Sequence, residues 1–159
     1  MQMLSLYLRN LFFTIIHPGL VAGLIPYWIL GRKWSRQFSL PFHLYQYVGI
    51  LIFSLGLFVL LTCIIRFASS GGGTLSPIDP TKKLVITGLY KYSRNPMYLG
   101  VTMILIGEAL FFQSYHLGIY LLLIVLVFNL FILAVEEPRL KRDFADEYRE
   151  YCGKVRRWL

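Results

Sequence analysis

Four long apolar stretches constrain this sequence more than any other feature. Each is close to the length of about 20 helical residues that crosses a bilayer. They span residues 11–30, 44–65, 97–115 and 117–135. Most of the charge collects between and after them, in blocks at residues 32–36, 66–94 and 136–157. Because 57% of the residues are hydrophobic and the charges are segregated in this way, the sequence predicts a membrane protein rather than a soluble domain.

The predicted fold is all-α. Residues 1–159 are expected to form one polytopic membrane domain, a helical bundle with about four transmembrane helices. The first stretch contains His17-Pro18-Gly19 and Pro26, so it either spans the bilayer or is re-entrant. The last two stretches are separated by so few residues that they form a tight antiparallel hairpin. Residues 31–43 are expected to be a short polar loop.

Two segments are expected to lie outside the bilayer: residues 67–95 as a long cytosolic loop and residues 136–159 as a cytosolic tail. Within the tail, apolar and aromatic residues recur at spacings of four, four and three. They are Leu140, Phe144, Tyr148 and Tyr151. That spacing predicts an amphipathic helix lying at the membrane surface.

The basic residues predict how the chain is oriented in the membrane and which molecules neutralise its positive charge. Thirteen of the 16 Lys and Arg residues fall on the side that holds both termini and residues 67–95, and three fall on the other side. By the positive-inside rule both termini are cytoplasmic, and the expected location is a bacterial inner membrane. A net charge of +8 can indicate nucleic acid, but these residues flank apolar segments, so anionic lipid headgroups are the expected counter-charge. The two cysteines show no metal-ligand spacing, and no metal site is predicted.

Two polar segments meet at one membrane edge under this topology. Residues 87–100, Thr-Gly-Leu-Tyr-Lys-Tyr-Ser-Arg-Asn-Pro-Met-Tyr-Leu-Gly, lead into the third stretch, and Glu136-Glu137-Pro138 leaves the fourth. Because these stretches form a hairpin, a partly aromatic loop and two carboxylates lie together, which makes a candidate small-molecule site. Taken alone, the same residues also fit a turn, a helix start and interfacial tyrosines.

These segments together resemble the superfamily of isoprenylcysteine carboxyl methyltransferases and phospholipid methyltransferases. The matching features are Gly88-Leu89-Tyr90, the run from Arg94 to Gly100, Glu136-Glu137, and a tail with Tyr148-x-x-Tyr151 and Val155-Arg156-Arg157-Trp158. The stretch from Gly73 to Pro80 fits bacterial members. The likeness is strong over residues 70–159 and loose over the first two stretches.

The resemblance implies S-adenosylmethionine as methyl donor, bound in a cytosol-facing pocket under the loop. The residues implied to form that pocket are Lys82, Lys83, Leu84, Val85, Tyr90, Asn95, Pro96, Met97 and Tyr98. Glu136 is implied to pair with the donor's charged amino-acid end.

Further roles are predicted from residue chemistry. Arg94 and the backbone amides of the loop are expected to receive the donor's carboxylate, although Arg94 also fits a side chain that extends to the lipid headgroups. Glu137 is expected to act as a base toward an amine or hydroxyl acceptor, because Glu136 is taken by the donor. Asn129 and Ile132, which precede the Glu pair on the same helix, are expected to line the acceptor channel, although Asn129 also fits a hydrogen bond across helices.

The acceptor is expected to be lipophilic. Ile132 stands where isoprenylcysteine enzymes carry an Arg for the substrate's carboxylate, and Arg139 is expected to face solvent. An amine, hydroxyl or thiol on a lipid-like molecule therefore fits better than a prenylcysteine carboxylate. Glu108, past the bilayer midplane, is expected to hydrogen-bond to another helix.

Two other functions remain open at this point. Sterol reductases share a similar C-terminal architecture, but the phosphates of NADPH call for more Arg and Lys than this short loop offers. A non-catalytic membrane scaffold that keeps the fold is the third possibility. The sequence identifies neither the acceptor nor the oligomeric state.

Overall fold

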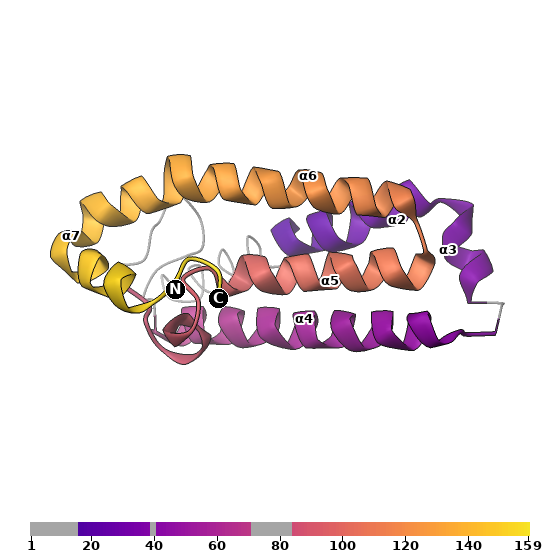
Figure 1. Cartoon of the computed structure of the whole chain (residues 1–159), viewed down its shortest axis with the longest axis horizontal. Helices are drawn as coiled ribbons and strands as arrows, with labels where there is room; N and C mark the ends of the chain where they lie inside the picture. The colour runs from indigo at the N-terminus through magenta and orange to yellow at the C-terminus, as the bar shows by residue number, and fades with distance from the viewer. Residues whose placement is uncertain (1–15, 39–40, 71–83) are drawn as a thin grey trace, which may run out of the picture.

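The computed structural model describes residues 16–38, 41–70 and 84–159, and these residues form a bundle of helices (Figure 1). Its elements are η1 (Leu20–Leu24), α2 (Ile25–Leu30), α3 (Arg32–Gln37), α4 (Leu44–Ser70), η2 (Gly88–Lys91), α5 (Pro96–Phe112), α6 (Tyr115–Phe131), η3 (Ile132–Glu136) and α7 (Glu137–Lys154). The described part contains no strand, so the predicted all-α class is confirmed.

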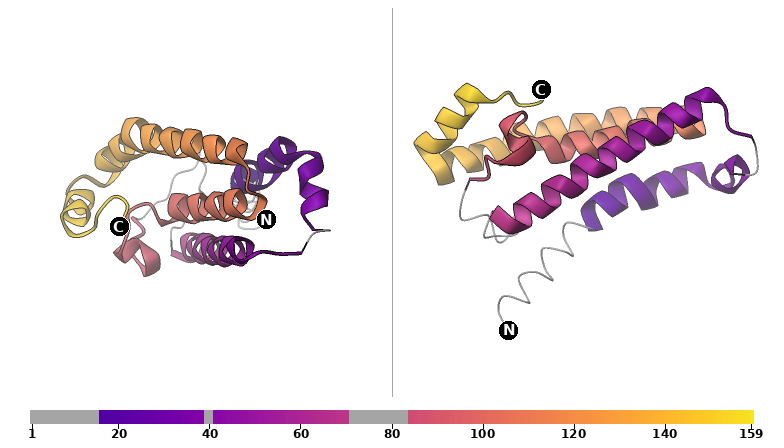
Figure 2. Two further views of the ribbon diagram at one scale, coloured as in Figure 1. Left: turned by 45° about the vertical axis from the view of Figure 1, so that its right-hand side comes forward. Right: turned by 90° about the horizontal axis from the view of Figure 1, so that it is seen from below.

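Three long helices, α4, α5 and α6, run side by side along the length of the bundle (Figures 1 and 2). Residues 84–95 and α7 lie at one end of it, whereas α3 and the turn at Gln113 and Ser114 lie at the other. The loop that enters α5 and the helix that follows α6 therefore share one end of the molecule, as the hairpin argument predicts.

The closest helix packing is between α4 and α5, and glycines make it possible. A Cβ atom built on Gly49 would lie 2.9 Å from the carbonyl oxygen of Gly107, and one on Gly56 would lie 2.8 Å from that of Gly100. Both pairs bring backbone against backbone, so a side chain at any of the four positions must push the helices apart. The shared seven-residue spacing of these glycines in the two helices is a signal that the sequence analysis did not use.

The described part of the first apolar stretch is one continuous helix from residue 16 to residue 30. It contains a π-helical turn, η1, in which the N–H of Ile25 donates to the carbonyl of Leu20. This wider turn precedes Pro26, which has no N–H to give to a regular helix. The hydroxyl of Tyr120 on α6 donates to the carbonyl of Val21 at 2.9 Å, so this helix packs along the bundle and no re-entrant turn occurs within residues 16–30.

Residues 32–37 form the short helix α3, so the prediction of a polar loop over residues 31–43 is wrong for this part. Gly31, at φ 51°, turns the chain between α2 and α3. The Trp34 ring then stacks on Phe112 with centroids 5.1 Å apart, and the ammonium of Lys33 donates to the carbonyl of Gln113 at 3.0 Å. Aromatic packing against the end of α5 thus fixes this segment.

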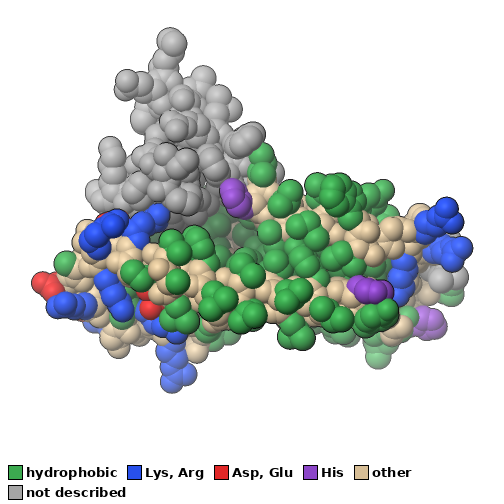
Figure 3. Space-filling view, turned by 90° about the horizontal axis from the view of Figure 1, so that it is seen from above, with side chains coloured by type: hydrophobic (Ala, Val, Ile, Leu, Met, Phe, Trp, Pro, Cys, Tyr) green, Lys and Arg blue, Asp and Glu red, His purple; other side chains and the backbone are tan. Residues whose placement is uncertain are grey.

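The surface of the bundle is apolar along the middle of its long helices and charged at its ends (Figure 3). The helices Leu44–Arg66 and Tyr115–Lys154 are long and apolar enough to cross a membrane, and Ile16–Leu30 and Pro96–Phe112 are shorter apolar helices. Figure 3 shows apolar side chains covering the middle of one face, with Lys and Arg side chains gathered at both ends. On α6, Leu122 is 70% exposed. So much exposed apolar surface is typical of a face that meets lipid.

The α6 helix continues through the π-helix η3 into α7 without a break, and the chain bends only at Ala145, where φ is 37°. Tyr148 and Tyr151, from the predicted amphipathic stripe, are buried. They face the protein rather than a membrane surface, so the predicted role of these two residues in an interfacial helix is wrong.

Candidate functional site

The loop that enters α5 is held by α7 and by residues 155–159, which we call the C-terminal strap. The hydroxyl of Tyr151 donates to the carbonyl of Tyr90 at 2.6 Å. The backbone N–H of Arg94 donates to the carbonyl of Arg156 at 3.0 Å. The side chains of Ser93 and Asn95 donate to the carbonyl of Arg157 at 3.3 Å and 3.0 Å. Loop, helix and strap therefore form one hydrogen-bonded unit at this end of the bundle.

Glu137 is buried at the centre of this unit and pairs with two guanidinium groups. Its two carboxylate oxygens accept from Nε and Nη2 of Arg157, at 2.8 Å and 3.1 Å. Nη1 of Arg94 lies 3.4 Å from Oε1 of the same carboxylate. Burial alone would favour the neutral acid, but the hydrogen bonds and charges of Arg157 and Arg94 outweigh it and hold the pKa of Glu137 below its usual value.

This ion pair argues against two of the roles predicted from the sequence. Glu137 is not a free base, because a carboxylate with a lowered pKa and two cationic partners is a poor proton acceptor. Arg94 is not free for a ligand, because its Nη1 also donates to Sγ of Cys152 at 2.7 Å and to the hydroxyl of Tyr148 at 3.5 Å. Its buried Nε has no hydrogen-bond partner among the described residues.

Glu136 has a different environment from its neighbour. Its Oε2 accepts from the hydroxyl of Tyr98 on α5 at 2.7 Å, and the Tyr98 ring packs on Phe128 of α6 with centroids 4.8 Å apart. Burial raises the pKa of Glu136, against the opposing effects of the Tyr98 hydrogen bond and the positive charge of Arg139. Successive helical residues point about 100° apart, so the two glutamates have separate partners.

Arg139 is only partly exposed, so the prediction that it faces solvent is wrong. Its Nε is buried and has no hydrogen-bond partner. It follows Glu136 by three residues, which places both on the same face of the helix. Arg139 lies in the basic tail of the sequence, but its charged neighbours Lys141 and Arg142 are exposed and Arg139 is not.

The residues predicted to form the cofactor pocket have different environments in the structure. Val85 and Tyr90 are buried against Cys63 of α4, with Met97 packed beside them. Pro96 and Asn95 are buried where α5 begins, and the Asn95 amide is committed to the strap. Tyr98 contacts Glu136, Leu84 is only partly buried, and Lys82 and Lys83 lie outside the described residues.

The predicted channel residues are not free either. Asn129 accepts from the indole N–H of Trp158 at 3.3 Å and donates to the carbonyl of Val125 at 2.8 Å. Ile132 is completely buried. The amide of Asn129 thus anchors the strap and Ile132 is packed within the protein, and that they line an acceptor channel stays a prediction. Glu108 is buried in α5, and the hydrogen bond predicted for it is absent at Oε2, which has no partner.

Sequence reasoning missed the residues that close the unit. Arg157 and Trp158 of the strap and Tyr151 of α7 make its main side-chain contacts. Their signal was present as the Tyr-x-x-Tyr and Arg-Trp pattern of the tail, which was noted only as part of a resemblance.

Comparison with known proteins identifies the class. The model of the phospholipid methyltransferase family matches residues 44–147, a range that runs from the start of α4 into α7. The chain therefore belongs to the phospholipid methyltransferase family, and the resemblance found in the sequence is confirmed. An uncharacterized protein of Haemophilus influenzae is 41% identical over 63 residues, which are 40% of this chain and 100% of that protein. No solved structure matches the chain.

Proposed function

We propose that this protein transfers a methyl group from S-adenosylmethionine to a lipophilic acceptor in the membrane. Family membership supports methyl transfer to a lipid-like molecule. The observation that carries the finer proposal is the partly buried carboxylate of Glu136, which accepts a hydrogen bond from Tyr98 at 2.7 Å at the end of the bundle where the loop and α7 meet. A carboxylate that is shielded from solvent is suited to binding a small cationic ligand.

The residues present fit the proposed donor. The carboxylate of Glu136 can accept hydrogen bonds from its ammonium group, while the buried Nε of Arg139, which has no partner among the described residues, offers a donor for an anion. Val85, Tyr90 and Met97 provide apolar surface for a flat base. When bound, S-adenosylmethionine supplies an electrophilic methyl group on a sulfonium.

The chain's own part is binding and orientation. Tyr98 fixes the Glu136 carboxylate through its hydroxyl, and Arg157 with Arg94 holds Glu137 away as a structural anion. Positioning of this kind supplies much of the rate acceleration in a displacement that needs no covalent help from the protein. The exposed apolar side chains of α6 provide a route by which the acceptor reaches the site from the lipid.

We also propose the membrane arrangement. Four spans place residues 84–95 and α7 on one side, together with both termini, and the basic residues favour the cytoplasm for that side. A reporter fused after Leu159 should then be cytoplasmic, and one inserted between α3 and α4 should be external.

Calorimetry on the purified protein in detergent tests the donor. S-adenosylmethionine and its demethylated product should bind at micromolar concentration, and NADPH should not. Labelled donor with a total lipid extract should then give labelled lipid, whereas a farnesylcysteine analogue provides the comparison for a carboxylate acceptor. Preferential binding of NADPH would make the protein a reductase and reject the proposal.

A further inference from the structure

Arg139 is the partly buried arginine of α7. The other arginines of this helix, Arg142 and Arg149, form exposed ion pairs with Asp143 and Asp146. Arg139 forms no ion pair with any described residue, and its Nε is buried without a partner. A buried guanidinium N–H that lacks an acceptor is costly unless a ligand satisfies it.

The position of Arg139 relative to Glu136 specifies what that ligand carries. Residues three apart on a helix have Cβ atoms about 5–6 Å apart on one face. Glu136 is anchored by Tyr98 on one oxygen, and the positive charge of Arg139 is close enough to lower its pKa, although no ion pair joins the two. The helix thus presents a carboxylate and a guanidinium side by side, each with unused hydrogen-bonding capacity.

An α-amino acid carries the complementary pair of charges on a single carbon atom. We propose that Arg139 binds the carboxylate of S-adenosylmethionine while Glu136 binds its ammonium, so that one helical turn holds the amino-acid end of the donor. This inference rests on the proposed function and replaces Arg94, the residue that sequence reasoning had assigned to the carboxylate. A guanidinium matches a carboxylate with two parallel hydrogen bonds, which adds orientation to the affinity.

Arg94 is unsuited to this role because its charge is already used. Its Nη1 lies 3.4 Å from Glu137 and donates to Cys152, and its backbone is hydrogen-bonded to the strap. Withdrawing it to bind a ligand would leave the buried Glu137 with one cation in place of two. No such contact has to break for Arg139.

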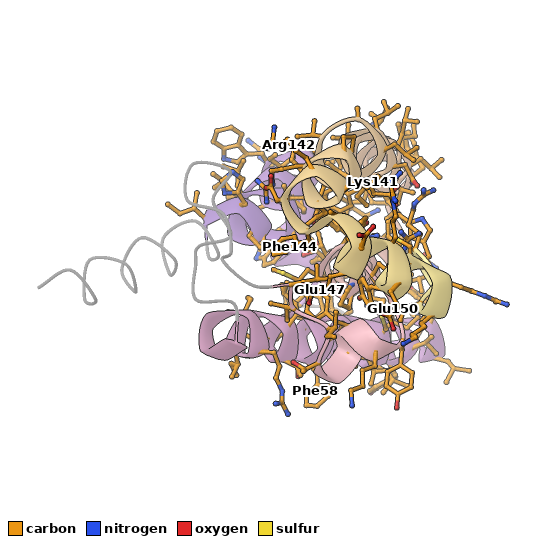
Figure 4. All side chains as sticks on the ribbon, turned by 90° about the vertical axis from the view of Figure 1, so that its left-hand side faces the viewer. Phe58, Lys141, Arg142, Phe144, Glu147 and Glu150 are labelled. Carbon is orange, nitrogen blue, oxygen red and sulfur yellow. The ribbon has the colours of Figure 1, made fainter. Side chains whose placement is uncertain are left out.

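The test compares S-adenosylmethionine with its decarboxylated analogue, which keeps the amine and the sulfonium. Calorimetry should show that the wild-type protein binds the intact donor roughly 10- to 100-fold more tightly, the range expected for a charged hydrogen bond. Arg139→Gln should bind both compounds equally, at about the affinity of the wild type for the analogue. Figure 4 looks onto α7 and labels Arg142, which is exposed; Arg142→Gln is the matched control and should keep the full preference.

The outcomes separate this inference from the proposed function. If the wild type binds neither compound, the proposed function itself fails. If the wild type shows no preference, or if Arg139→Gln keeps it, Arg139 does not bind the carboxylate. Loss of the preference in Arg94→Gln with its retention in Arg139→Gln would return the role to Arg94. Because each preference is a ratio measured on one protein preparation, a partly unfolded variant does not imitate the expected result, and circular dichroism checks its helix content.

Discussion

The strap depends on one buried ion pair, and breaking it should open this end of the bundle. Arg157→Gln removes the guanidinium that donates to both oxygens of Glu137. Removal of one member of a fully buried pair costs about 3–5 kcal/mol. The Arg157 side chain is 35% exposed, and Arg94 remains 3.4 Å from the carboxylate, so solvent and a second cation reduce the cost. We expect about 1–3 kcal/mol, the value of a charged hydrogen bond that leaves its partner partly satisfied.

That cost should be visible as local opening. The backbone N–H of Arg94 donates to the carbonyl of Arg156, so its exchange with solvent reports whether the strap is closed. A loss of 1–3 kcal/mol corresponds to roughly 5- to 150-fold faster hydrogen exchange at this amide. The amides in the middle of α4, far from the strap, should exchange as in the wild type.

The matched control is the neighbouring residue. Arg156 is exposed, and Arg156→Gln keeps the carbonyl that binds Arg94 while removing the same charge from the strap. It should leave exchange at the Arg94 amide unchanged. Equal acceleration in both variants would show that overall charge, and not the Glu137 pair, holds the strap, and would refute this reasoning.

Further predictions concern the acids and the glycines. Glu136→Gln should weaken binding of S-adenosylmethionine by about 1.5–3 kcal/mol in calorimetry, whereas Glu108→Gln, near the end of α5 away from the site, should leave that affinity unchanged. Because the pKa of Glu137 is lowered in the folded protein, its ionised form stabilises the strap above the usual pKa of 4.5, and this stability is lost as pH falls through the lower folded value. The ¹⁹F signal of a fluorinated Trp158 should therefore report release of the strap only in acid. In Glu137→Gln the signal should no longer depend on pH in this range. Gly107→Ala, whose Cβ would lie 2.7 Å from the carbonyl oxygen of Gly49, should lower stability by about 1–3 kcal/mol in detergent, while Gly118→Ala, with nothing within 4 Å, should not lower it.

The sequence predicted the elements better than their contacts. Long apolar runs predicted the helices over residues 44–65, 97–115 and 117–135 to within a few residues, because apolar length alone determines such segments. The short helix α3 was missed because its stability comes from Trp34 stacking on Phe112. That contact joins residues far apart in the sequence, and no local pattern reports it.

The candidate site shows the same limit. The sequence brought the loop and the Glu pair together correctly, since hairpin geometry depends only on helix order. It did not show that Glu137 and Arg94 pair with each other inside the protein, whereas Glu136 and Arg139 do not form an ion pair. Arg94 and Arg139 both lie in charged segments of the sequence, and both have a buried Nε. Only the contacts distinguish them, since Arg94 pairs with Glu137 beside the strap, and the strap is held by the hydrogen bonds of Ser93 and Asn95 to Arg157.

Two adjacent glutamates thus illustrate how environment assigns function. Burial raises the pKa of Glu136, and its one protein partner is a neutral hydroxyl, so a cation from outside the chain gains the most by binding there. Glu137 already forms ion pairs with Arg94 and Arg157, and a further cation would have to displace one of them. Substitutions at the two positions should therefore separate: a change at Glu136 acts on ligand affinity with the strap closed, and a change at Glu137 acts on the strap first and on the ligand only through it.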